Sequence, residues 1–220
     1  MSNPFCISTR RTFLKLTAGA AGALSGMASV AELASADDKD INIIGPKPGY
    51  TPQVGTLVSM LTWMQTAVDR STDGLTQQDL DWLFDSQANT IGALMLHLAA
   101  TETYYQLNTF DGMKWDSWPG EVKNKWDAAM NLGDAGRATI KGHDRAYYLK
   151  ILAEARETSL AEFRKRDDKW LMAVDKDWGW GLTNNYCKWF HVCEHISHHS
   201  GQIALLRKRL PSAKQSKSSE

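Results

Sequence analysis

The sequence lacks several features that define large classes of proteins. Its 220 residues include only three cysteines, too few for the disulfide framework of a small secreted domain. Basic and acidic side chains balance at 25 each, so no basic excess is available to bind nucleic acid. The chain has no internal repeat, no glycine-rich loop of the nucleotide-binding type and no strand patterning. With these classes excluded, a helical domain is the expected structure. A chain of 220 residues is long enough for such a domain to have a hydrophobic core.

The first 36 residues have the composition of a targeting segment. They carry the pair Arg10-Arg11, an apolar stretch rich in alanine and glycine at residues 16–30, and small residues at 34–36. This arrangement resembles a cleaved twin-arginine export signal, which implies a periplasmic or other extracytoplasmic location. The apolar stretch is short and glycine-rich for a membrane span, so we expect no stable membrane insertion after cleavage. An uncleaved N-terminal anchor is the alternative.

Four later segments carry apolar residues at spacings of three and four, which predicts amphipathic helices. We expect these long helices at residues 51–70, 89–107, 143–166 and 183–209. The predicted fold class is therefore all-α, a four-helix bundle spanning residues 50–210. The connection between the second and third helices, residues 108–142, is long and contains a short helix near residues 121–130. An extended lead-in at residues 37–49 and a disordered tail at residues 211–220 flank the bundle.

The last of these helices contains four of the six histidines within nine residues. On a helical wheel, His195 and His199 fall within the apolar stripe, while His191 and His198 lie toward its polar edge. An unpaired buried polar group costs about 1–3 kcal/mol, so imidazoles that face a core need partners. A metal ion would use two histidines at i and i+4 together. His97, on the margin of the second helix, is the histidine left to supply a third ligand.

Two other interpretations of the histidines are open. They could pair with carboxylates and carbonyl groups and hold no metal. Alternatively, His191-Val-Cys-Glu-His195 matches the inverted zinc-protease motif, with Glu194 as general base. Proteases with that motif take a further acidic ligand downstream, and Glu220 in the tail is the only acidic residue after His195 here. The pattern therefore favours the three-histidine site over the protease motif.

Two pieces of the chain resemble the DinB-like superfamily of four-helix bundles. They are Asn89-Thr-Ile-Gly ahead of His97, and the spacing His195-x3-His199-x-Gly201-Gln202. The resemblance covers roughly residues 50–210. It implies that His97, His195 and His199 bind a divalent metal ion, usually zinc or nickel. It also implies a metal-dependent transferase or hydrolase with a small-molecule substrate, and some relatives transfer low-molecular-weight thiols onto electrophiles. Many members carry arginine where this chain has Ser200.

Three histidine ligands would leave a coordination position for water or substrate. His191, Glu102 and Glu194 are then candidates for orienting the ligands or transferring protons. A non-catalytic metal-binding or stress-related bundle is the alternative function. The sequence leaves open whether the protein forms a homodimer. It also leaves open whether the tryptophans of the two long connections wall a pocket or fill the fold; these are Trp115, Trp118, Trp178 and Trp180.

Overall fold

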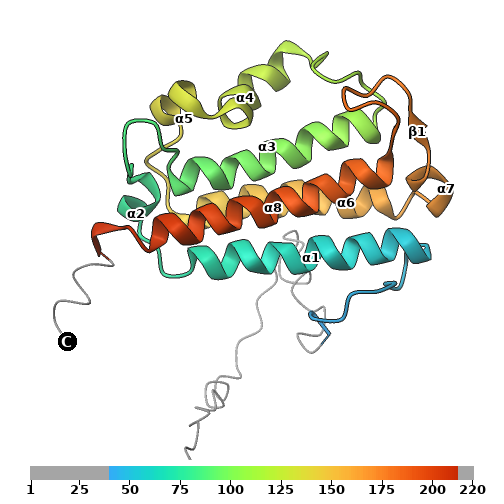
Figure 1. Cartoon of the computed structure of the whole chain (residues 1–220), viewed down its shortest axis with the longest axis horizontal. Helices are drawn as coiled ribbons and strands as arrows, with labels where there is room; N and C mark the ends of the chain where they lie inside the picture. The colour runs from blue at the N-terminus through green and yellow to red at the C-terminus, as the bar shows by residue number, and fades with distance from the viewer. Residues whose placement is uncertain (1–39, 213–220) are drawn as a thin grey trace, which may run out of the picture. The chain divides into compact units, whose positions relative to one another are not determined.

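The computed structural model describes residues 40–212 of the chain (Figure 1). The predicted export signal at residues 1–36 lies outside the described residues, as does most of the predicted tail. Of that tail, only Pro211 and Ser212 are described, and the Ser212 hydroxyl donates to Asp79 Oδ1 at 2.7 Å. Between residues 40 and 212 no helix is both long and apolar enough to cross a membrane.

Helices make up most of the described residues, which confirms the all-α prediction. The long ones are α1 (Pro52–Thr72), α3 (Ile91–Thr109), α6 (Arg145–Phe163) and α8 (Asn185–Arg207). Each begins and ends within three residues of its predicted bounds. The short ones are α2 (Gln77–Asp81), α4 (Gly120–Asn131), α5 (Gly133–Thr139) and α7 (Asp168–Leu171). Two short strands, β1 (Val174–Asp175) and β2 (Thr183–Asn184), form an antiparallel ribbon.

The long connection after α3 is a crossover. Figure 1 shows α4 running back along α3, so that α6 starts at the end where α3 started and follows the same direction. Parallel neighbours in a bundle require such a connection, because a short loop joins only antiparallel helices. α4 matches the predicted short helix, whereas α5 and the ribbon were not predicted. The ribbon could not be predicted because strands of two residues are too short to show the alternation of apolar and polar residues that marks a strand.

Polar side chains at the helix starts explain the bounds of the bundle. Thr90 Oγ1 accepts from Ala93 N at 3.0 Å at the start of α3. Asn184 Oδ1 caps α8 by accepting from Cys187 N at 2.8 Å. α1 has no side-chain cap of its own, and Asp168 Oδ1 of α7 instead accepts from the first backbone N–H groups of that helix. A cap of this kind stabilises a helix by about 0.5–2 kcal/mol.

The core lies between the four long helices and sets how closely they approach. α3 packs against α6 through Gly92, where a Cβ atom would lie 2.8 Å from the ring of Tyr148. Only glycine allows this approach without a shift of the ring. The centre of the same core is aromatic, with Trp189 and Phe163 fully buried and their ring centroids 4.6 Å apart. Both described cysteines, Cys187 and Cys193, are unpaired, and they lie six residues apart on α8, where their side chains point in different directions.

Candidate metal centre

Three imidazoles from two helices meet in the bundle. His97 comes from α3, and His195 and His199 come from adjacent turns of α8. His195 Nε2 lies 3.2 Å from His97 Nε2 and 3.1 Å from His199 Nε2, and the three nitrogens all lie within 4.8 Å of one another. Metal–nitrogen bonds of about 2.1 Å at tetrahedral angles would separate neighbouring ligand nitrogens by about 3.4 Å. The two short distances are close to this value, so the three nitrogens could bind a shared ion.

Hydrogen bonds on the outer nitrogens fix two of these rings. His97 Nδ1 lies 2.9 Å from the carbonyl oxygen of Ala129 in α4, and His199 Nδ1 lies 2.7 Å from Gln202 Oε1. Each oxygen accepts, so each Nδ1 carries the proton and each Nε2 presents a lone pair inward. His195 Nε2 can donate to only one of those lone pairs. The donor set thus fits a divalent cation, which satisfies all three nitrogens at once.

Burial keeps the three imidazoles in the neutral form that binds metals. Loss of solvent lowers the pKa of His97 from its ordinary value. The same cause, together with repulsion from neighbouring imidazoles, lowers the pKa of His195 to about 3. Burial likewise lowers the pKa of His199 to about 4, although the bond to Gln202 opposes the shift. Protons therefore compete weakly for these nitrogens at neutral pH.

Glu102 is held in an ion pair between helices. Its carboxylate oxygens accept from Arg156 Nε at 2.8 Å and Nη2 at 2.9 Å, and Ser159 Oγ donates to Oε1 at 2.6 Å. Arg156 Nη1 also donates to the carbonyl oxygen of Leu61 in α1. None of the hydrogen bonds of Glu102 reaches His97, His195 or His199. Its observed contacts tie α3 to α6 and, through Arg156, to α1.

His191 and Glu194 lie beside the three histidines and bond to each other. His191 Nδ1 is 2.6 Å from Glu194 Oε1, and the ring centroid of His191 is 5.4 Å from that of His195. Of the two histidines in the H-x-x-E-H pattern, His195 belongs to the cluster and His191 does not. Within residues 40–212, the group that could hold a metal consists of His97, His195 and His199. His191 instead bonds to Glu194 and borders a cavity that His195 also lines.

The two groups that bond to the outer nitrogens of His97 and His199 were not predicted from the sequence. Gln202 lies three residues after His199 on α8, a spacing that brings side chains together on a helix, so this signal was available. Gln202 Nε2 also bonds the exposed His198 at 3.1 Å, which agrees with the orientation of its amide. The carbonyl group of Ala129 has no side-chain signal. Its role depends on the crossover that places the end of α4 over His97.

An aromatic cavity of about 410 Å³ opens beside the cluster. His195 and His191 form part of its lining, so one of the three candidate metal ligands borders this cavity. Burial raises the pKa of Tyr105 far above its ordinary value, so its hydroxyl stays protonated. Trp118 is buried beside Tyr104, whereas three other tryptophans wall the cavity. The full lining is Thr101, Tyr105, Trp115, Met130, Trp178, Gly179, Trp180, His191 and His195.

Comparison with known proteins places this chain in a family. The family model described as mycothiol S-transferase matches residues 56–211, which include all four long helices except the first turn of α1. The chain belongs to the mycothiol S-transferase family. This family has the DinB-like fold, so the resemblance to DinB-like bundles is confirmed.

One solved structure supports the fold assignment. It is described as a conserved protein from Enterococcus faecalis, and it shares 15% sequence identity with this chain. The match covers 69% of this chain and 93% of that one, with a TM-score of 0.53. At this identity the likeness concerns the fold alone. No curated protein matches the chain.

Proposed function

We propose that this protein is a metal-dependent S-transferase that joins a low-molecular-weight thiol to a small electrophile with an apolar body. One observation carries the proposal: the inward-facing nitrogens of His97, His195 and His199 converge beside a cavity that His195 itself lines. Membership of the mycothiol S-transferase family supports transfer over hydrolysis. Imidazole ligands suit zinc and nickel, which we propose as the ion. When bound, such an ion lowers the pKa of a thiol or polarises an electrophile.

The walls of the cavity favour an electrophile with an aromatic or apolar body. Trp115, Trp178 and Trp180 present indole rings to the cavity, and Met130 adds an adaptable apolar surface. A volume of about 410 Å³ lies within the range of small-molecule sites. Such walls bind an apolar body and exclude water from the reacting atoms. An aromatic epoxide is an electrophile with such an apolar body.

His191 is positioned to move the proton that S-transfer releases. Its Nδ1 is bonded to Glu194, which orients the ring and leaves Nε2 as the nitrogen able to exchange a proton. With an epoxide, the thiol sulfur forms a bond to carbon and the carbon–oxygen bond breaks. The S–H proton passes to His191 Nε2, and the released oxygen then takes up a proton. Glu194 acts through His191 as a positioning residue.

The proposal is tested by thiol-plus-epoxide turnover with protein purified without a histidine tag. Metal-free protein should be inactive, and added zinc or nickel should restore turnover. His195→Ala should remain inactive in both conditions. His198→Ala is the matched control, because this exposed histidine on the same helix should keep full activity. If ester and amide substrates are turned over while thiol transfer is absent, a hydrolase replaces the transferase.

A non-catalytic metal-binding bundle is the other outcome of the same experiment. It would be established if the protein binds metal and no substrate panel shows turnover that depends on the metal. His191→Ala separates the roles further. We expect it to keep the metal and lose most of the turnover, with the pH dependence of kcat changed. His191→Ala protein with unchanged kcat at every pH would remove this residue from the mechanism.

We also propose that the protein is exported through the twin-arginine pathway, as the pair Arg10-Arg11 and the following apolar stretch indicate. This pathway would allow the protein to load its metal before crossing the membrane. The test is fractionation of cells that express the full chain and the variant with Arg10→Lys and Arg11→Lys. Export of the native chain with retention of the variant supports the proposal, and equal distribution of both contradicts it.

A further inference from the structure

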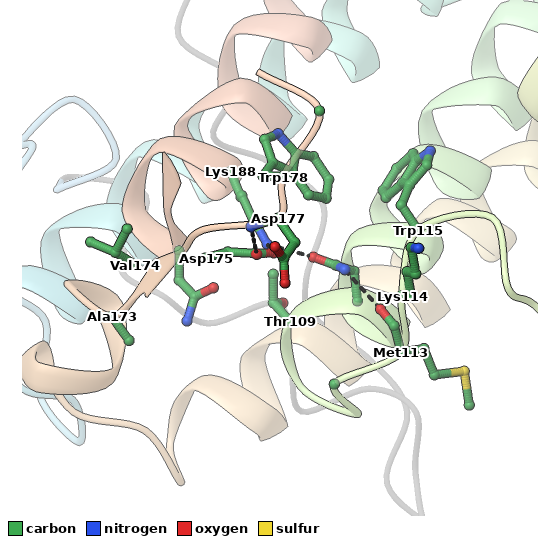
Figure 2. Close-up of a pocket in the computed structure, with 14 residues that line it drawn as sticks. Thr109, Met113, Lys114, Trp115, Ala173, Val174, Asp175, Asp177, Trp178 and Lys188 are labelled. Carbon is green, nitrogen blue, oxygen red and sulfur yellow. Dashed lines mark hydrogen bonds and ion pairs between the residues drawn. The ribbon is translucent and has the colours of Figure 1, made fainter. Parts of the chain in front are cut away.

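A cavity of about 730 Å³ lies at the end of the bundle where α8 begins, and its charged groups balance. Its lining includes the cations Lys114 and Lys188 and the anions Asp175 and Asp177. Figure 2 shows Lys188 beside Asp175, where Lys188 Nζ donates to Asp175 Oδ2 at 2.7 Å. Because the charges of this lining cancel, they favour no charged ligand.

A groove of about 580 Å³ between α1 and α8 carries a single charge instead. Among the described residues that line it, Glu194 is the charged one. The side chain of Glu194 is 48% exposed, so a ligand can reach its carboxylate from solvent. Cys193 also lines the groove, and burial raises the pKa of its thiol to about 12, so the thiol stays neutral. The groove therefore presents one anionic group.

The rest of the groove is mostly apolar and aromatic. Trp63 of α1 and Phe190 of α8 contribute rings, and Met60 and Met64 contribute flexible thioether side chains. Phe190 is 54% exposed, so its ring is available to a ligand. A flat apolar body fits such walls, because aromatic rings stack on it and methionine side chains adapt to its outline.

The segment that precedes α1 forms a further wall of the groove and is held in place. Asn42 and Ile44 of this segment line the groove. Trp63 Nε1 donates to Asn42 Oδ1 at 3.1 Å, and the backbone N–H of Gly45 donates to Ser59 Oγ at 3.1 Å. These bonds fix the wall before a ligand arrives, which lowers the cost of ordering the site on binding.

The charge and the rings of the groove together favour a cation. A carboxylate offers about four acceptor positions, and Glu194 Oε1 uses one of them to accept from His191 Nδ1 at 2.6 Å. An ammonium group can therefore donate to the same carboxylate, and the face of an indole ring attracts it as well. An anion would be repelled by Glu194, and a neutral molecule would gain neither contact.

We propose that this groove binds an organic cation, an amine that carries a flat apolar body. The ammonium group bonds to Glu194, and the apolar body packs against Trp63 and Phe190. This site goes beyond the proposed S-transfer, because binding needs neither the metal ion nor a thiol. The bound ammonium shares the carboxylate that orients His191, which links the groove to the aromatic cavity that His191 lines.

Direct binding tests the groove without any reaction. The probes share a naphthalene body and differ in charge: 1-naphthylmethylamine is a cation at neutral pH, 1-naphthylmethanol is neutral and 1-naphthoate is an anion. Each is added to metal-loaded protein while the indole N–H signal of Trp63 is followed by NMR, and Trp63→Phe assigns that signal. The amine should give saturable shifts and bind about tenfold more tightly than the alcohol, as for an exposed ion pair combined with a cation–π contact. The anion should bind most weakly.

Two variants separate the charge of the groove from its apolar walls. Glu194→Gln removes the charge at nearly constant size, so the preference for the amine over the alcohol should fall by about threefold or more. Glu157→Gln makes the same change at an exposed position of α6 and should keep the native preference. Ser197 lines the groove, and Ser197→Trp should abolish the shifts with all three probes by filling it. Thermal unfolding identifies any variant that fails to fold, in which case Glu194→Gln alone decides the result.

Three results would overturn the cation site. They are equal binding of the amine and the alcohol by the native protein, tighter binding of the anion, and an unchanged preference in Glu194→Gln. A second copy of the chain is the other occupant that the apolar walls could take. A native protein that sediments as a dimer, together with a monomeric Ser197→Trp variant and no shifts with the amine, would replace the proposed ligand by that copy.

Turnover tests the link from the groove to His191, and this part alone rests on the proposed S-transfer. At saturation of the groove, the amine should lower kcat without raising KM for the epoxide, because it acts on His191 through Glu194 and leaves the aromatic cavity free. The alcohol at equal saturation should leave kcat unchanged. Saturable binding of the amine with unchanged kcat refutes the link and keeps the cation site. Absence of S-transfer with saturable binding refutes the proposed reaction and also keeps the site.

Discussion

Replacing Gln202 with leucine should weaken metal binding while leaving the bundle folded. Gln202 Oε1 accepts from His199 Nδ1 at 2.7 Å, and this contact fixes the tautomer and the orientation of the ring. Leucine has a similar size and offers no acceptor. Loss of such a partner typically lowers metal affinity about 10- to 100-fold, which corresponds to about 1.4–2.8 kcal/mol. The effect should fall on affinity because His199 itself remains.

The assay is a competition titration of zinc between the untagged protein and a chromophoric chelator. Gln202→Glu restores an acceptor at the same position, so its affinity should stay within about threefold of the native value. His198→Ala removes the other, exposed partner of Gln202 and should also bind zinc normally. Unfolding of the metal-free forms checks that all three variants are folded. Native affinity in Gln202→Leu would refute the orientation argument, and so would equal losses in all three variants.

Three further perturbations test other parts of the structure. Glu102→Ala leaves the charge of Arg156 buried without its partner, so the free energy of unfolding measured with denaturant should fall by about 3–5 kcal/mol; a loss below about 1 kcal/mol would contradict the ion pair. In metal-free protein, His195 and His199 have folded pKa values of about 3 and 4, below the unfolded value of about 6.5. The unfolded chain then binds more protons, so the stability present above pH 6.5 should be lost as pH falls toward 4, by up to about 2.7 kcal/mol per pH unit; unfolding curves that do not change with pH would be inconsistent with neutral buried rings. Trp180→Ala removes an aromatic wall and should raise KM for the electrophile about two- to tenfold in steady-state assays, and an unchanged KM would place the electrophile elsewhere.

Much of the bundle was predictable because its signals are local. Apolar residues at spacings of three and four locate the long helices, and Thr90 and Asn184 mark the starts of α3 and α8 by capping them. The wheel placed His195 and His199 inward, and His97 followed as the histidine on another core margin. The burial of His97 and His199 and the short distances between the rings agree with this prediction.

Glu102 was predicted to act beside the metal site, but the structure pairs it with Arg156 instead. Glu102 follows His97 by five residues, which places it about 140° around the helix from that ring. The wheel could therefore have separated Glu102 from the metal cluster. Its partner Arg156 could not be predicted, because the pairing depends on the register between α3 and α6, and no local pattern specifies that register.

The aromatic cavity beside the histidines depends on long-range packing. Trp115 follows α3 in a loop, while Trp178 and Trp180 lie between β1 and β2. No helical or strand period constrains such segments, so the sequence could not place these rings relative to one another. The pairing of Val174 with Asn184 closes the ribbon and brings Trp180 to His191, with Trp178 against Trp180. This cavity could therefore be identified only in the folded chain.

The central claim is that three histidines from two helices hold a single divalent ion. Metal content measured by mass spectrometry on untagged protein tests it most directly, with the native chain compared with His97→Ala, His195→Ala, His199→Ala and His198→Ala. We predict that the native chain and His198→Ala carry zinc or nickel and that each of the other variants loses it. Equal metal content in all five proteins, or none in the native chain after exposure to both metals, would contradict the account.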